Sequence, residues 1–193
     1  MDWLQEAFFE PTMLQAVIVI SLVSAVGLFL GRQKIFGISL GITFVFFAGI
    51  LAGHFGIVVN KDMLNFAQSF GLILFVYSLG LQVGPGFFSS LKKGGVAMNM
   101  MGLGVVLLGL ILTLVLHWTT GVSLPNMVGL LCGAVTNTPA LGAAQQALLQ
   151  VNPADSKEVT DMALACAVAY PLGVVGVIMA IILLRKVFAN KNL

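Results

Sequence analysis

Residues 135–140 read Val135-Thr136-Asn137-Thr138-Pro139-Ala140, in the middle of a long apolar segment. Proline removes a backbone donor and interrupts a helix, and here three side chains that can form hydrogen bonds precede it. In lipid, an interrupted helix is tolerated only where the break is buried in protein or lines a wet cavity. Transporters build solute sites from helices broken in this way. The stretch therefore predicts a solute-binding break inside a membrane protein.

The composition around the break is that of a membrane protein. Of the 193 residues, 59% are hydrophobic and 8% are charged, whereas soluble domains carry roughly a quarter charged residues. Residues 36–59, 94–150 and 162–184 contain no Asp, Glu, Lys or Arg. The formal net charge of +2 is too small and too dispersed to indicate a nucleic-acid partner. The expected surroundings are instead the lipid bilayer.

The sequence predicts an all-α, polytopic membrane protein with a single transmembrane domain, residues 1–193. About 20 apolar residues cross a bilayer as a helix, and five segments meet this length. These predicted crossings are 13–30, 37–58, 64–84, 94–118 and 161–184. A sixth apolar segment, 126–149, contains the break.

The basic residues of the short loops predict the topology. Arg32 and Lys34 follow the first crossing, Lys92 and Lys93 follow the third, and the tail after residue 184 is also basic. Such loops face the cytoplasm. We therefore expect the N-terminus outside and the C-terminus in the cytoplasm.

Segment 126–149 is predicted to be a re-entrant hairpin. If it crossed the bilayer, the basic tail would lie outside and the acidic loop at 150–161 inside, against the charge rule. Its arms, 126–135 and 139–149, each reach about half of the hydrocarbon thickness as helices. Five crossings place the two termini on opposite sides. Duplication of such a unit gives an inverted repeat, so we expect one unit of an inverted-repeat secondary transporter, completed by a second membrane half or by homo-oligomerisation.

The predicted hairpin tip offers two hydroxyls and one amide, from Thr136, Asn137 and Thr138. Pro139 is a favoured first helical residue, and Thr138 is a suitable N-cap for the downstream arm. The positive end of that arm would stabilise an anion, and the break should free backbone groups at both helix ends. The alternative is a proline-kinked helix in which the polar side chains only satisfy these freed groups.

A second weak point in the helical pattern precedes the third loop. Four helix-weakening residues fall within seven positions, Gly80 to Gly86, and predict a helix end or an unwound stretch. Ser78 and Gln82 lie four residues apart on one helix face and are candidates to line the solute path. The alternative to a solute-lining role is that these residues only end the helix and let it pack closely against a neighbour.

The remaining polar and small residues indicate packing. Cys132 and Cys166 are expected to be small buried hydrophobes, and Gly49 with Gly53 suggests a close helix contact. The sequence contains no metal-ligand spacing, phosphate-binding glycine loop or nucleophile–base pair. We therefore expect no cofactor, no metal and no enzymatic activity.

Two motifs resemble the bacterial aspartate–alanine exchanger family. They read Leu79-Gly80-Leu81-Gln82-Val83-Gly84-Pro85-Gly86-Phe87-Phe88 and Gly129-Leu130-Leu131-Cys132-Gly133-Ala134-Val135-Thr136-Asn137-Thr138-Pro139-Ala140-Leu141. The resemblance covers essentially the whole chain, aligned to one of the two homologous membrane halves. It implies an inner-membrane carrier that exchanges or exports small amino acids or carboxylates. It also implies that Thr136–Pro139 belong to the substrate-binding hairpin, with Gly80, Gln82 and Gly84 nearby.

The expected function is thus secondary transport of a small anionic solute by alternating access, of the antiporter kind. The chain departs from the family pattern in length, because that pattern includes a second membrane half and, in most members, cytoplasmic regulatory domains. We therefore expect either a split half that pairs with a separate partner or an excised domain. Two alternatives stay open on the sequence. One is a channel-like oligomer, because selectivity filters also use polar re-entrant loops. The other is a non-transporting membrane assembly subunit.

Overall fold

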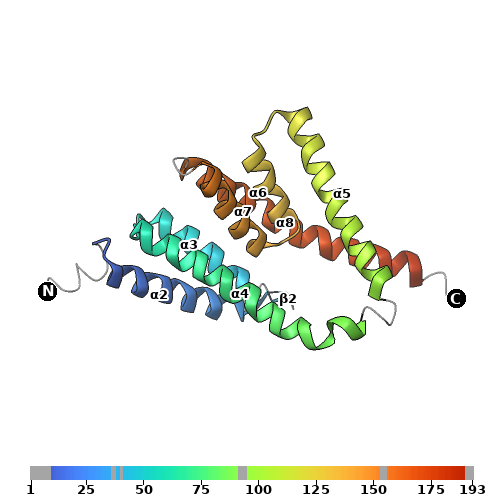
Figure 1. Cartoon of the computed structure of the whole chain (residues 1–193), viewed down its shortest axis with the longest axis horizontal. Coiled ribbons are helices and arrows are strands. Elements are labelled where there is room, and N and C mark those ends of the chain that lie inside the picture. Colours follow the sequence, from blue (N-terminus) through green and yellow to red (C-terminus); the bar gives the residue numbers. More distant parts are fainter. Residues whose placement is uncertain (1–9, 36–37, 40, 91–94, 153–155, 190–193) are drawn as a thin grey trace. The chain divides into compact units, whose positions relative to one another are not determined.

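The computed structural model describes residues 10–35, 38–39, 41–90, 95–152 and 156–189, and these are largely helical. The helices are α2 (Met13–Gly31), α3 (Phe44–His54), α4 (Lys61–Ser90), α5 (Val96–Thr120), α6 (Leu124–Ala134), α7 (Thr138–Val151) and α8 (Ser156–Ala189) (Figure 1). Two short antiparallel strands, β1 (Lys34–Ile35) and β2 (Ile38–Ser39), and the 3-10 turn η1 (Gly41–Thr43) join α2 to α3. The predicted all-α class is confirmed.

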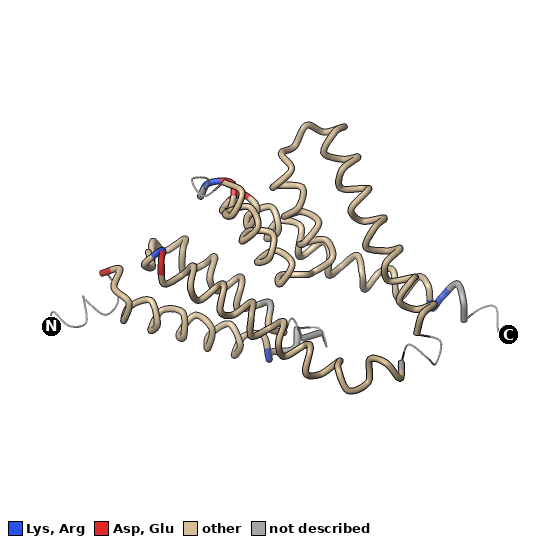
Figure 2. Tube along the Cα trace, in the orientation of Figure 1, with Lys and Arg blue, Asp and Glu red and all other residues tan. Residues whose placement is uncertain are grey.

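Four of the described helices are long and apolar enough to cross a membrane: α2, α4, α5 and α8. The helices α3 and α6 are shorter apolar helices of 11 residues each. Charged residues lie near the ends of the described helices, and long stretches between them carry none (Figure 2). This pattern is that of a polytopic membrane protein, because the hydrocarbon layer excludes unpaired charges.

The chain divides into two compact groups, residues 1–71 and 72–193. In the first, α3 returns antiparallel along α2. A Cβ atom on Gly27 would overlap the backbone of Val45, and one on Gly31 would overlap the carbonyl oxygen of Gly41. These two glycines therefore let the second segment lie directly on α2.

Among the described residues of the predicted second crossing, 37–58, the α-helical part is Phe44–His54, which follows the 3-10 turn η1. As a helix these 11 residues rise about 16 Å. The connection after α3 nevertheless reaches the start of α2, because Gln15 Nε2 donates a hydrogen bond to the carbonyl of Val58 at 2.7 Å. Asn60 Nδ2 likewise donates to the carbonyl of Pro11 at 3.4 Å. The non-helical residues thus extend the path of α3 beyond its helical length, and the crossing stays a prediction.

The expected helix end between Gly80 and Gly86 is wrong. Helix α4 runs without interruption from Lys61 to Ser90, with Pro85 inside it. Proline removes one helical hydrogen bond, but an unwound segment in lipid would expose many unpaired backbone groups, so continuing the helix is favoured. Ser89 Oγ donates to the carbonyl of Gly86 at 2.9 Å and so satisfies a backbone acceptor near the proline.

Candidate solute-binding hairpin

The break predicted from the sequence lies between α6 and α7. The described helices end at Ala134 and restart at Thr138, with 11 and 14 residues in the two arms. The arms therefore rise about 16 and 21 Å, each short of the roughly 30 Å of hydrocarbon that a crossing needs. The two arms contact each other and both contact α8. The interruption is confirmed, whereas entry and exit on one side of the membrane stays a prediction.

The carbonyl end of α6 is closed by the chain itself. Thr136 N–H donates to the carbonyl of Gly133 at 3.0 Å, and Asn137 N–H donates to that of Cys132 at 2.8 Å. These two bonds form a Schellman motif, which normally places glycine at the residue with left-handed backbone. Here the residue is Thr136, with φ of 54°. It is the single non-glycine residue with positive φ in the described part of the chain.

A left-handed threonine is a strained residue. Its branched Cβ crowds the backbone in this conformation, at a cost on the order of 1–3 kcal/mol. Such strain persists where surrounding contacts hold it, and it concentrates at functional sites. In this hairpin it fixes the direction in which the Thr136 side chain leaves the tip.

Replacing Thr136 by glycine is expected to raise the stability of the protein by about 1 kcal/mol over the alanine variant. Neither variant has the hydroxyl, so the difference between them isolates the backbone strain. Thermal melting in detergent measures it. Equal melting temperatures for Thr136→Gly and Thr136→Ala would show that the backbone carries no strain there.

The amino end of α7 is capped by Asn137 and not by Thr138. Asn137 Oδ1 accepts a hydrogen bond from the Ala140 N–H at 3.0 Å, and the Asn137 carbonyl accepts one from Leu141 at 3.3 Å. The predicted N-cap is therefore wrong by one residue, and Thr138 and Pro139 form the first turn. Both residue types can cap. Asn137 takes the position because the helix begins one residue earlier than expected.

The tip leaves three polar side-chain groups without a hydrogen-bond partner among the described residues. They are the hydroxyls of Thr136 and Thr138 and the amide nitrogen of Asn137. Fewer backbone groups are free than expected, because the Schellman bonds and the Asn137 cap satisfy several of them. The side chains, rather than the backbone, supply the groups for a ligand. The alternative of a proline-kinked helix requires all three side chains to satisfy backbone groups. Among them, Asn137 alone does so, by accepting from the Ala140 N–H.

Helix α8 supports the hairpin from behind. A Cβ atom at Gly129 or Gly133 of α6 would overlap the carbonyl oxygen of Met162 or Cys166 of α8, respectively. From the other side, a Cβ atom at Gly173 would lie 2.5 Å from the Ala134 carbonyl oxygen and 2.6 Å from that of Gly133. The two backbones therefore touch over about three turns, up to the tip itself.

Two further features hold this unit together. Gln145 Nε2 of α7 donates to the carbonyl of Val159 of α8 at 2.9 Å, which ties the second arm to the same support. Cys132 and Cys166 are buried free thiols, so the prediction for both is confirmed. Tyr170 is also buried, with 7% of its surface exposed.

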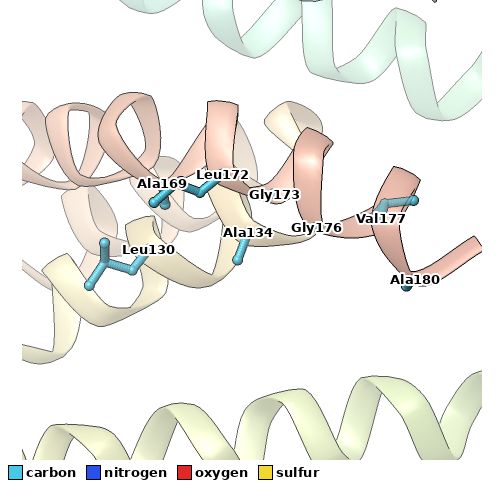
Figure 3. A pocket seen from close by; sticks show the side chains of 8 residues that line it. All are labelled: Leu130, Ala134, Ala169, Leu172, Gly173, Gly176, Val177 and Ala180. Atoms are coloured by element: carbon cyan, nitrogen blue, oxygen red, sulfur yellow. The ribbon is translucent and has the colours of Figure 1, made fainter. Parts of the chain in front are cut away.

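An apolar groove runs from the hairpin onto the next turns of α8 (Figure 3). Its volume is about 530 Å³. Its walls are Leu130, Ala134, Ala169, Leu172, Gly173, Gly176, Val177 and Ala180. The small residues among them leave room for an apolar group or another helix beside the tip.

The candidates on α4 are not gathered around the hairpin. Ser78, Gly80, Gln82 and Gly84 are all exposed. Within the described residues, α4 has no extensive packing against α6, α7 or α8. Their role in solute binding stays a prediction.

The three glycines of the α6–α8 contact were not predicted from the sequence. The signal was present, because Gly129 and Gly133 are four residues apart, the spacing of a close helix contact. Gly49 and Gly53 share that spacing, and the predicted close helix contact was placed on them. Yet a Cβ atom at either would meet nothing within 4 Å.

Long apolar helices and an interrupted helical pair with a polar tip are features of membrane permeases. The chain belongs to the Asp-Al_Ex family, described as a predicted permease membrane region, whose model matches residues 19–186. The family prediction is confirmed. The matched residues are thus those of a membrane region of the kind that this family model describes.

Several bacterial transporters are similar to the chain. One from Bacteroides thetaiotaomicron is 64% identical over 192 residues, which cover 100% of this chain and 34% of the relative. One from Bacteroides fragilis is 63% identical over the same shares. One from Porphyromonas gingivalis is 60% identical over 183 residues, covering 95% of this chain and 33% of the relative. Each is named only as an uncharacterized transporter, and no solved structure matches the chain.

The chain thus spans about a third of the length of the curated relatives it matches.

Proposed function

We propose that this chain is one membrane half of a secondary transporter and binds a small anionic solute at the α6–α7 tip. The observation that carries the proposal is the set of three unengaged polar groups, on Thr136, Asn137 and Thr138, at a helix break. In a membrane, such groups are costly unless they have a partner. A solute with several hydrogen-bond acceptors is a suitable partner.

The chemistry of the tip favours an anion over a cation. Residues 94–150 contain no carboxylate to hold a cation and no Lys or Arg to hold an anion by direct pairing. The tip offers hydroxyl and amide donors, and α7 begins there with its positive end. A carboxylate would therefore be bound by dipoles and neutral donors, with an arginine supplied by the other membrane half. Small amino acids and carboxylates fit this description.

The contacts that hold the hairpin support a mechanism of alternating access. Helices α6, α7 and α8 contact one another through glycine contacts and the Gln145 bond. They would therefore move together, while the earlier helices act as the scaffold. Exchange of one solute for another would occur when the tip faces each side of the inner membrane in turn.

Counterflow in proteoliposomes tests the proposed function. A carrier preloaded with unlabelled small amino acids or dicarboxylates should take up the labelled solute, with a rate that saturates. Steady ionic current without saturation would point to a channel. If the purified protein neither binds nor moves small carboxylates, the chain would belong to a non-transporting assembly.

A further inference from the structure

Oxygen acceptors lie at one end of the contact between α6 and α8, the end away from the hairpin tip. A shallow groove of about 480 Å³ lies there, between the start of α6 and the first turns of α8. Asn126 and Asp161 are its polar residues, and its other walls are Val122, Leu130, Leu164, Ala165 and Val168. An amide and a carboxylate from two different helices therefore share one mostly apolar groove.

Neither polar residue is engaged by another described residue. The Oδ1 atom of Asn126 is buried and has no hydrogen-bond partner in the described part of the chain. Asp161 likewise forms no ion pair or hydrogen bond with any described residue. A buried acceptor without a donor destabilises a fold unless something fills the position.

The neighbouring backbone adds further negative potential. Helix α5 ends at Thr120 with Gly121 in the left-handed conformation, so its negative pole lies two residues before Val122 in the groove wall. The carbonyl of Val122 is 2.6 Å from His117 Nδ1. A carbonyl oxygen has two lone pairs, so this one can still accept from a ligand.

Positive side chains are scarce around the groove. Residues 94–150 carry no Lys or Arg, so α5, α6 and α7 supply none from within that range. On α8, Lys157 precedes Asp161 by one turn but is exposed, and the acidic Glu158 lies beside it in sequence. One feature disfavours a cation: the N–H groups in the first turn of α6 carry partial positive charge, and the Ser123 side chain does not cap them.

We propose that this groove binds a small monovalent cation between Asn126 Oδ1 and the Asp161 carboxylate. One carboxylate with neutral oxygens matches a single positive charge, whereas divalent ions usually collect more carboxylates. Carrier proteins hold coupling ions with the same kinds of group: side-chain oxygens, helix carboxyl ends and backbone carbonyls. The cation is either inorganic, such as sodium, or the ammonium group of an amino-acid solute on its way to the tip. The site is distinct from the hairpin tip, because Asn126 lies in the first turn of α6 and Thr136 lies just beyond its last residue.

Melting of the purified protein in detergent tests the site. Four chloride salts are compared at equal ionic strength: sodium, potassium, methylammonium and choline. We expect a saturable rise in melting temperature with one of the first three over choline, because a ligand that binds only the folded state stabilises it. A rise with sodium or potassium assigns an inorganic ion, and a rise with methylammonium alone assigns an ammonium group.

Two variants and a matched control locate the binding. The measured midpoint is the salt concentration that gives half of the rise in melting temperature. Asp161→Asn should raise this midpoint at least tenfold, and Asn126→Ala should raise it three- to tenfold. Glu158→Gln removes a carboxylate from the same turn of α8 but not from the groove, and should leave the midpoint unchanged. If Asp161→Asn does not fold, Asn126→Ala decides.

Equal melting of the wild type in all four salts would overturn the proposal. A melting temperature that falls equally in every salt for Asp161→Asn would also overturn it. That result would mean that Asp161 stabilises the positive N-terminus of α6 and binds no cation. No transport is measured, so either failure leaves the proposed function of the hairpin untouched.

Discussion

Replacing Gly133 by alanine is expected to destabilise the folded protein, whereas the same change at Gly142 is expected to stabilise it. At Gly133 the new methyl group would overlap the Cys166 carbonyl oxygen and lie 2.8 Å from the Ala169 Cβ atom. Overpacking of this kind typically costs about 1–3 kcal/mol. At Gly142, in α7, nothing lies within 4 Å of the added atom. There the helix gains about 0.5–1 kcal/mol from the lower backbone entropy of alanine.

Thermal melting of the two variants in detergent measures this difference. For a chain of this size, 1 kcal/mol corresponds to about 2–4 °C, so shifts of opposite sign should be resolved. Gly129→Ala should behave like Gly133→Ala, since its methyl group would meet the Met162 carbonyl. Shifts of the same sign for Gly133→Ala and Gly142→Ala would mean that the close α6–α8 contact is absent.

Replacing Asn137 should reduce solute uptake at least tenfold, whichever of two replacements is used. Asn137→Ala removes both the cap on α7 and the free amide nitrogen at the tip. Asn137→Asp keeps an oxygen to accept from Ala140 but places a negative charge where the anion would bind. A hydrogen bond to a charged group contributes about 1.5–3 kcal/mol, which corresponds to roughly ten- to a hundredfold in binding.

Stability measurements separate the loss of the helix cap from the loss of the solute contact. Loss of the cap should cost Asn137→Ala about 1 kcal/mol, whereas Asn137→Asp should melt close to the wild type. Uptake into proteoliposomes and melting in detergent are measured on the same preparations. Wild-type uptake by Asn137→Asp would remove this side chain from the solute site and leave it a helix cap.

The interruption of the hairpin was predictable because its causes are local. Pro139 cannot continue a helix from α6, and the charge-free arms on either side are apolar enough to be helical. The exact cap was not predictable, because Asn137 and Thr138 are both good capping residues. Which of them caps depends on the left-handed Thr136, a residue type that rarely adopts this conformation.

The course of α4 was mispredicted for a different reason. Gly80, Gly84, Pro85 and Gly86 weaken a helix in water, where an open backbone can bond to solvent. Lipid offers no such partner, so the same residues are accommodated inside a continuous helix. Propensity alone therefore places helix ends poorly in membrane segments.

The glycine contacts depend on tertiary structure. Gly129 with Gly133 and Gly49 with Gly53 have the same spacing in the sequence, but only the first pair meets another helix backbone. Nothing local distinguishes the two pairs, because the partner of α6 is more than 20 residues away in α8. The role of Ser78 and Gln82 likewise depends on which helices face α4, and it stays a prediction.

Cysteine labelling at Val151 tests the central claim most directly, that α6 and α7 enter and leave on one side of the membrane. Val151 ends α7 and is 85% exposed, while the native Cys132 and Cys166 are buried. In intact cells, a membrane-impermeant maleimide should label Val151→Cys and also Ser123→Cys, on the turn before α6. It should not label Arg32→Cys, in the first basic loop. Labelling of Val151→Cys only from the cytoplasmic side would make the segment an ordinary crossing and contradict the hairpin.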